Sequence, residues 1–256
     1  MSKNSMPHQL ALEAISKRYL QHAELAAALA IDVAGKLNKA IVQRGIASVA
    51  FSGGSTPKLF LRALAAQTVD WSRVQVSLVD DRCVAASEDR SNARLLQAAL
   101  FDLLAVKPQF HPLYIEGESL ACCEQRIANL PLPFDCLVLG MGDDAHTASF
   151  FPDADNLAEM LELSDTRLIG ETRSKASVER RLTFRLPAVL ASRNIILHIC
   201  GPGKWQVLNH ACEALAGVDG DVQAVEQQYP ILAVLGRSSM QQEQGVPAAV
   251  YHAQEC

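Results

Sequence analysis

The chain has 256 residues, of which 49% are hydrophobic, and its 23 Lys and Arg stand against 28 Asp and Glu, a formal net charge of -5. A chain of this length and apolar content can bury a full core, which excludes extended disorder. The acidic balance lacks the electrostatic footprint of a general nucleic-acid binder, and apolar runs such as residues 25–31 fall short of the roughly 20 residues that a membrane span needs.

The N-terminal segment and the cysteines indicate the compartment. The first ten residues contain no apolar stretch of the signal-peptide type, so we expect a soluble, cytoplasmic protein. The seven cysteines are odd in number and lack the paired C-x-x-C spacing of a zinc site. Several lie inside apolar runs, as Cys136 and Cys200 do. We therefore expect reduced, buried thiols and no metal site.

Hydrophobic periodicity predicts the fold class. Apolar residues recur mostly at four-residue steps from Ile15 to Leu37, which predicts one long amphipathic helix or two consecutive helices. Short apolar runs follow at residues 47–51, 74–79, 134–139 and 194–200, with helix-period stretches between them. This alternation predicts one α/β domain over residues 1–256, a three-layer, mostly parallel Rossmann-like sheet with helices on both faces. Residues 153–175 and the tail from Leu235 are left unassigned.

A polar loop follows each of these apolar runs. The loops are residues 52–58, 80–82, 140–149 and 201–204. In a parallel sheet, the loops that follow strands emerge at the carboxyl edge, where open α/β folds bind ligands. We therefore expect the four loops to converge on one crevice.

The first loop is rich in glycine and hydroxyl groups. Gly53 and Gly54 let backbone N–H groups approach a ligand. Ser55 or Thr56, followed by Pro57, suits the N-cap and first position of a helix. Together they would form an anion cradle at a helix N-terminus. A tight strand-to-helix turn with a good cap explains the same residues equally well.

Two further loops supply cations. Arg82 follows Asp80 and Asp81, so it is either part of a surface ion pair or a guanidinium held by its acidic neighbours and directed at a phosphate or carboxylate. Lys204, close after two glycines and a proline, is either a solvated lysine at a helix start or a phosphate ligand.

His146 is the strongest candidate for chemistry. An unperturbed imidazole titrates near pH ~6.5, which suits proton transfer at neutral pH. Asp144 lies two residues earlier and can orient the ring. Of the other histidines, we expect His198, which lies in an apolar run, to be structural, and His8, His22 and His252 to lie in surface stretches.

Residues 140–145 also fit the dinucleotide fingerprint G-x-G-x-x-A after a predicted strand. Asp143 and Asp144 would place negative charge beside a pyrophosphate, and Pro152 leaves little room for the helix that should follow. We therefore expect no dinucleotide cofactor.

Taken together, the loops resemble those of the 6-phosphogluconolactonases, within the superfamily of sugar-phosphate isomerase and deaminase folds. The resemblance runs from about Leu12 to Ile231 and rests on residues 52–57, 80–82 with Asn92 downstream, 140–152, 181–183 and 201–204. Asp81 stands where the family usually has Glu, and Ala145 where it has Gly. If that glycine has a positive φ, Ala145 would bear a strain of roughly 1–2 kcal/mol, or the shifted loop would displace His146.

The resemblance implies hydrolysis of 6-phospho-D-glucono-1,5-lactone to 6-phosphogluconate in the oxidative pentose phosphate pathway, without a cofactor. His146 would take a proton from water and return it to the departing ring oxygen, and Asp144 would orient the imidazole. Backbone N–H groups of the glycine loops would stabilise the oxyanion. The implied substrate-binding residues are Gly53, Gly54, Ser55, Asp80, Arg82, Arg181 and Lys204.

Two alternatives stay open. An amino-sugar-phosphate isomerase or deaminase shares the fold, but its Asp-Gly-His loop continues into a Phe-Asn-Glu-Pro-like segment, whereas residues 147–152 here are TASFFP. A catalytically silent sugar-phosphate-binding protein would keep the anion site and have lost the chemistry through Ala145.

Phosphate binding by an acidic chain requires a local excess of cations. The stretch from Arg167 to Arg185 contains six Lys and Arg against Glu171 and Glu179. We expect these cations and the two cationic loops to form a pocket for one small phosphosugar lactone, with no nucleic-acid or membrane partner. The sequence does not distinguish a monomer from a homodimer.

Overall fold

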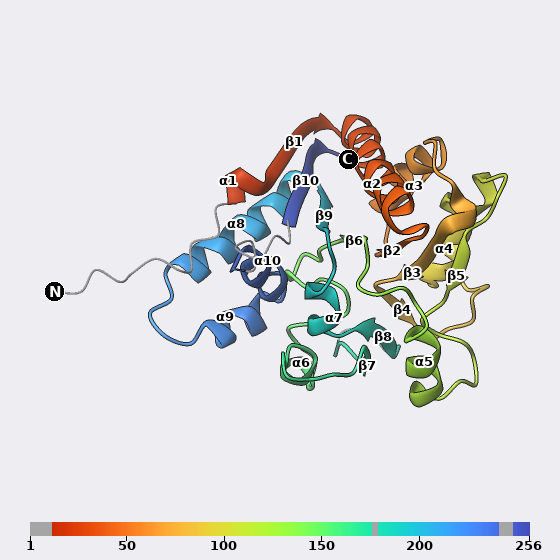
Figure 1. Ribbon diagram of the computed structural model, residues 1–256. Coiled ribbons are helices and arrows are strands. Elements are labelled where there is room, and N and C mark those ends of the chain that lie inside the picture. The colour runs from red at the N-terminus through yellow and green to blue at the C-terminus, as the bar shows by residue number, and fades with distance from the viewer. Residues whose placement is uncertain (1–11, 176–178, 241–247) are drawn as a thin grey trace.

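The computed structural model describes residues 12–175, 179–240 and 248–256. At its centre is a seven-stranded sheet in the order β1-β10-β9-β6-β2-β3-β5 (Figure 1), in which all neighbouring strands are parallel. In that order the strands are Ser16–Gln21, Ala248–Glu255, Ile195–Cys200, Cys136–Leu139, Ala47–Phe51, Val74–Leu78 and Gln109–His111.

Helices cover both faces of this sheet (Figure 1). On one face lie α2 (His22–Arg44) and α3 (Pro57–Ala65), which contact each other extensively. On the other lie α7 (Leu186–Leu190), α8 (Pro202–Ala216) and α10 (Ile231–Met240). The remaining helices are α1 (Leu12–Ile15), α4 (Asn92–Ala99), α5 (Leu120–Ile127), α6 (Leu157–Met160) and α9 (Val222–Gln228), with 3₁₀ turns at Trp71–Arg73 and Phe101–Leu103.

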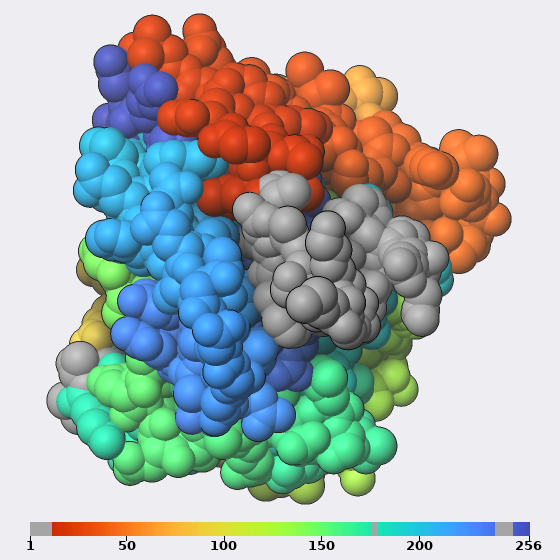
Figure 2. All heavy atoms as spheres, turned by 90° about the vertical axis from the view of Figure 1, so that its left-hand side faces the viewer, coloured from red at the N-terminus to blue at the C-terminus, as the bar shows by residue number. Residues whose placement is uncertain are grey.

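The second face is visible from the side. Figure 2 shows α8 and α9 in blue, between the red N-terminal elements above and the green segment that contains α6 below. Among the described residues, no helix combines the length and the apolar content that a bilayer crossing needs. The three-layer α/β architecture predicted from the sequence is confirmed.

The four predicted strands are all present, and the first matches β2 residue for residue. Each of these strands is buried along most or all of its length, as expected for a sheet covered on both faces. In α2 the four-residue repeat places Leu25, Leu29, Val33 and Leu37 in the core, where each is fully buried.

The predicted helix is interrupted before His22, where α1 ends at Ile15 and the prediction is wrong for the six residues that follow. Ser16–Gln21 is instead the edge strand β1, which pairs in parallel with β10 from Ser16↔Val250 to Gln21↔Glu255. The Tyr19 ring stacks on Tyr251, with 6.2 Å between the ring centroids. The partner strand lies more than 200 residues away in the sequence, so local periodicity contains no sign of the pairing.

A second, antiparallel sheet adjoins the carboxyl edge of the first. Its strands are β4 (Asp80–Arg82), β8 (Arg181–Phe184) and β7 (Ile169–Thr172), in that order. The register places Arg82 directly opposite Arg181. Because β4 follows β3 after one residue, this small sheet carries two cations to the edge where the parallel strands end.

Two expectations about single residues are corrected. Cys200 and Cys256 form a disulfide and Cys122 is exposed, so the prediction of reduced, buried thiols is wrong for these three. His252 is buried in β10 against Trp205 rather than on the surface. His8 lies outside the described residues.

Candidate active site

The loops after β2, β6 and β9 meet β4 and β8 around one cavity of about 240 Å³. The sequence-predicted residues that line it are Gly53, Gly54, Ser55, Asp80, Arg82, His146, Arg181 and Lys204. Asp144 joins this set through its contact with His146. The cavity has the size of one small ligand, since pockets for drug-sized molecules measure about 300–1,000 Å³.

The glycine loop packs closely against its neighbours. A Cβ on Gly53 would overlap the side-chain oxygen of Asn92, so only glycine fits there. Gly54 has a φ of 97°, a conformation that side chains rarely adopt. Thr56 and Pro57 occupy the N-cap and the first position of α3 as predicted, although the Thr56 side chain makes no capping hydrogen bond.

His146 and Asp144 form a hydrogen-bonded pair. Their Nδ1 and Oδ1 atoms are 2.5 Å apart, and the same carboxylate oxygen accepts the backbone N–H of His146 at 3.2 Å. Partial burial raises the pKa of Asp144, but the hydrogen bonds from His146 outweigh it and lower that pKa below its ordinary value. An ionised carboxylate only accepts, so Nδ1 carries the proton and Nε2 of the neutral ring has a free lone pair.

Two small residues shape the turn around this pair. A Cβ on Gly142 would overlap both the His146 ring and the Asp144 carboxylate. Ala145 is buried with a φ of 63°, which is the strained conformation predicted for it. Its carbonyl accepts the backbone N–H of Ile231 at 3.1 Å, so α10 holds the turn in place. His146 lines the cavity despite the strain.

Arg82 is not held by its acidic neighbours, contrary to the prediction. Its Nη1 donates to the carbonyl of Arg90 at 2.7 Å and to Oδ1 of Asn92 at 3.1 Å. The Asp81 carboxylate instead accepts the backbone N–H of Arg82 in β4 and those of Asn92 and Ala93 at the start of α4. Burial raises the pKa of Asp81 to about 6. Asp81 thus binds backbone N–H groups, and the guanidinium of Arg82 is bound by Asn92 instead.

Arg181 contacts both the carboxylate of Asp80 and Phe151 in the loop that follows His146. Its Nη1 lies 3.4 Å from Oδ2 of Asp80, and the Ser149 hydroxyl donates to the same oxygen at 2.6 Å. The Arg181 guanidinium lies over the Phe151 ring at 4.9 Å, and the His146 ring lies 4.5 Å from that ring. Burial lowers the pKa of Arg181, but an arginine stays charged at neutral pH.

The two guanidinium groups share an unusual feature. Nε of Arg82 and Nε of Arg181 are both buried, and neither has a hydrogen-bond partner among the described residues. A buried donor without a partner costs about 1–3 kcal/mol. An anion in the cavity would supply acceptors for both donors, so this arrangement fits a phosphate or carboxylate. The described residues contain no cluster of three His, Cys, Asp or Glu that could hold a metal ion.

Lys204 lies in the first turn of α8, after Gly201 with its φ of 92°. Its Nζ lies 2.8 Å from Oδ1 of Asp143, whose side chain is almost fully exposed. Lys204 therefore belongs to the cavity wall formed by β9 and α8, whereas the two arginines come from the antiparallel sheet.

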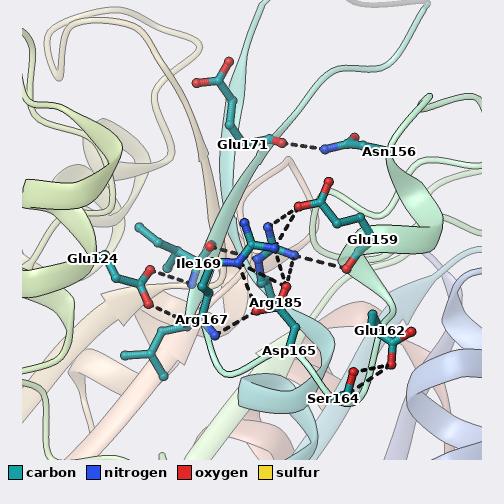
Figure 3. Close-up of polar contacts among 11 residues, drawn as sticks. Glu124, Asn156, Glu159, Glu162, Ser164, Asp165, Arg167, Ile169, Glu171 and Arg185 are labelled. Carbon is teal, nitrogen blue, oxygen red and sulfur yellow. Dashed lines mark hydrogen bonds and ion pairs between the residues drawn. The ribbon is translucent and has the colours of Figure 1, made fainter.

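The predicted cationic stretch is mostly not part of the site. Figure 3 shows Arg185 and Arg167 bound to the carboxylates of Glu159 and Asp165. Arg185 is buried there, with ion-pair distances of 2.8 Å to Glu159 and 2.7 Å to Asp165. Of the cations described between Arg167 and Arg185, Arg181 lines the cavity. The others were expected in the pocket only because they are close in sequence.

The dinucleotide fingerprint has no helix behind it. After residues 140–145 the chain makes a tight turn with a bridge between Thr147 and Phe150, and α6 begins only at Leu157. The pyrophosphate site of that motif requires a helix N-terminus next to the glycines. The loop therefore presents His146 and not a nucleotide site.

The sequence did not lead us to predict three residues of the site. Asn92 was noted only as part of a motif, while Ser149 and Phe151 were noted only as part of the loop after His146. The Ser91-Asn92 pair did contain a signal, since Ser91 is the N-cap of α4 and accepts the backbone N–H of Ala93. No local pattern indicates that Ser149 contacts Asp80.

Comparison with known sequences gives a consistent result. The family model for glucosamine-6-phosphate isomerases/6-phosphogluconolactonase matches residues 20–241. A 6-phosphogluconolactonase of Rhizobium meliloti (strain 1021) is 43% identical over 219 residues, which are 84% of this chain and 90% of that protein. One from Pseudomonas putida is 42% identical over 199 residues, 76% of this chain and 81% of that protein.

Solved structures agree with the sequence matches. The crystal structure of a 6-phosphogluconolactonase from Shewanella baltica OS155 superposes with a TM-score of 0.83 at 32% identity, over 93% of this chain and 97% of that one. A monomeric glucosamine-6-phosphate deaminase superposes with a TM-score of 0.66 at 17% identity, over 94% of this chain and 97% of that one, which indicates a shared fold alone.

Proposed function

The chain belongs to the glucosamine-6-phosphate isomerase/6-phosphogluconolactonase family, and on this basis we propose that it hydrolyses 6-phosphogluconolactone to 6-phosphogluconate with His146 as the base. One observation carries the assignment to this site: a cavity of about 240 Å³ brings the His146 and Asp144 pair together with two guanidinium groups whose Nε donors have no partner among the described residues. The reaction belongs to the pentose phosphate pathway. A phosphorylated substrate is charged and does not cross a bilayer unaided, which supports a cytoplasmic location.

The tautomer of His146 fits the chemistry. With Nδ1–H donating to Asp144, the lone pair of Nε2 accepts a proton from water as its oxygen attacks C1 of the lactone. The C1 to ring-oxygen bond then breaks, and the imidazolium returns the proton to the departing oxygen. Asp144 fixes the ring orientation and stabilises the imidazolium between the two steps.

The oxyanion that forms at C1 requires hydrogen-bond donors. The two glycine-containing loops, at Gly53 and Gly54 and at Gly140 and Gly142, bring backbone to the wall of the cavity that His146 also lines. Backbone N–H groups in such loops stabilise developing negative charge without rearrangement.

The phosphate group fits between Arg82 and Arg181. Each guanidinium retains donors without a partner among the described residues, and a phosphate would supply acceptors for them. Phe151 contacts both groups, with its ring 4.9 Å from the Arg181 guanidinium and 4.5 Å from the His146 ring, so the anion anchor and the base share one aromatic neighbour. Lys204 supplies further positive charge from the β9 side.

The loop chemistry does not favour the isomerase or deaminase alternative. Among the described residues that line the cavity, Asp80 is the one carboxylate, and Ser149 and Arg181 both engage it. The positions after His146 carry hydroxyl and apolar side chains, with Thr147 bonded to the Gly140 carbonyl at 2.8 Å. An acid that could move a proton on a sugar carbon is absent from this part of the described lining.

The test is hydrolysis of freshly generated 6-phosphogluconolactone, followed through a coupled dehydrogenase. Wild type is expected to exceed the spontaneous rate, and His146→Ala to lose about 10²–10⁴-fold in kcat, the contribution of a general base. His210→Ala is the matched control, because His210 is exposed on α8 outside the cavity. Asp144→Asn is expected to lower kcat by a larger factor than it changes KM. A wild type no faster than the buffer would refute the lactonase assignment and favour the silent binding protein.

A further inference from the structure

We propose that Asn92 is a positioning residue that fixes the guanidinium of Arg82 for the substrate's phosphate. The inference rests on the proposed function, in which Arg82 is a phosphate ligand. Asn92 is the first residue of α4 and is 3% exposed. Its side chain lines the same cavity as His146.

The Asn92 amide bridges a hydrogen-bond donor and a hydrogen-bond acceptor. Its Oδ1 accepts from Nη1 of Arg82 at 3.1 Å, and its Nδ2 donates to the backbone carbonyl of Asp80 at 2.8 Å. Arginine can only donate and a carbonyl can only accept, so these partners determine which way the amide points. At neutral pH, neither an aspartate nor a leucine of similar size can satisfy both.

The backbone of Asn92 is also held in place. Its N–H donates to Oδ1 of Asp81 at 2.7 Å, and Ser91 caps the helix that begins here. Both the start of α4 and the end of β4 are therefore fixed where the Asn92 side chain leaves the chain. A long, flexible arginine side chain is thus anchored by a short, rigid one.

The glycine loop rests on the same amide. A Cβ on Gly53 would overlap Oδ1, Cγ and Nδ2 of Asn92, so the loop backbone lies directly against the amide. Asn92 therefore contacts the anion cradle and the cation at once. It sets their spacing without any need to touch the reacting carbon.

The position of Arg82 depends on this contact. The hydrogen bonds described for its guanidinium use Nη1, and the second acceptor, the Arg90 carbonyl, lies in an exposed loop. Nε is buried without a partner among the described residues and is left for a ligand. Removing the Asn92 amide would leave Arg82 tied only to that loop, free to rotate out of the cavity.

A double-mutant cycle tests the inference. KM and kcat for 6-phosphogluconolactone are measured for wild type, Asn92→Ala, Arg82→Ala and the double variant. Asn92→Ala is expected to raise KM about tenfold and lower kcat less than about threefold, because ground-state and transition-state binding of the phosphate weaken together. In the Arg82→Ala background the same substitution is expected to change KM less than about twofold. Equal changes in both backgrounds would overturn the proposal.

Asn194→Ala is the matched control. Its side chain also donates to a backbone carbonyl, that of Asp135 at 2.8 Å, but it lies outside the cavity lining. A fall in Tm with an unchanged KM is expected. If Asn92→Ala does not fold, Asn92→Ser takes its place in the cycle. The serine hydroxyl can bind a water molecule, but the side chain is too short to bridge Asp80 and Arg82.

Failure of the proposed function is distinguishable from failure of this inference. If wild type does not hydrolyse the lactone, the same cycle is run on the affinity for 6-phosphogluconate, measured by calorimetry. A loss of affinity that disappears in the Arg82→Ala background supports the role of Asn92 without any turnover. An additive loss refutes it.

Discussion

The Ser149 hydroxyl donates a 2.6 Å hydrogen bond to Oδ2 of Asp80, and both residues are buried. Ser149 lies three residues after His146 in the same loop, while Asp80 opens β4 and contacts Arg181. One bond therefore joins the loop of the proposed base to β4, the strand that carries Arg82. Reactivity depends steeply on such spacing, since a displacement of about 1 Å can cost about a hundredfold in rate.

Gly142→Ala is expected to inactivate a folded enzyme. The new Cβ would overlap the His146 ring and the Asp144 carboxylate, so the ring must move. We expect kcat/KM to fall by about a hundredfold or more. Gly35→Ala is the glycine control, because Gly35 lies within α2 with open space at its Cβ position. A Gly142→Ala enzyme with wild-type kinetics would show that the His146 and Asp144 contact is not needed.

Ala145→Gly is expected to change little. Glycine relieves roughly 1–2 kcal/mol of left-handed strain, but loses a buried methyl group worth about 0.8 kcal/mol and gains about 0.4–1 kcal/mol of unfolded-state entropy. The contributions nearly cancel, so we expect Tm to stay within about 3 °C. The kcat/KM should stay within about threefold, because Asp144 holds His146 in either case. A tenfold gain would show that Ala145 keeps His146 out of place.

Arg185→Ala and Arg181→Ala should separate stability from binding. Arg185 is buried against Glu159 and Asp165 (Figure 3), so its loss is expected to lower the free energy of unfolding by about 3 kcal/mol. Its KM should be that of wild type, because it lies outside the cavity lining. Arg181→Ala is expected to raise KM at least about tenfold. Thermal unfolding and steady-state kinetics check both, and a raised KM in Arg185→Ala would return that residue to the phosphate site.

Stability is expected to fall as the pH drops below about 6.5, the ordinary pKa of histidine. Burial lowers the pKa of His198 in the folded protein to about 3, so the unfolded chain binds an extra proton between these values. The stability present above the unfolded pKa is therefore lost on acidification, by about 2 kcal/mol between pH 7 and pH 5. Urea unfolding at both pH values should show a smaller loss in His198→Phe. An identical loss would assign the effect to other groups.

Much of the site could be predicted because its residues directly follow strands. The runs at 47–51 and 134–139 mark strands by composition alone, and a parallel sheet brings the ends of its strands to one edge. The glycine loop, the His146 turn and Lys204 followed from that rule. The strain at Ala145 also followed, since a single substitution against the family pattern exposed it.

The same reasoning was wrong where side-chain partners come from far away in the sequence. Arg181 and Arg185 are four residues apart and chemically identical, yet one lines the cavity and the other is bound to Glu159 and Asp165. The strand β1 shows the same limit, because its partner β10 lies at the other end of the described chain.

The sequence by itself determined the fold class, the strand ends and the loops that line the candidate site, because these depend on local hydrophobic patterns and on the geometry of a parallel sheet. Only the tertiary structure decided which polar groups pair: Asn92 with Arg82, and Ser149 with Asp80. Hydrogen bonds require atoms within about 3 Å, and such distances are set by the packing of segments that the sequence separates.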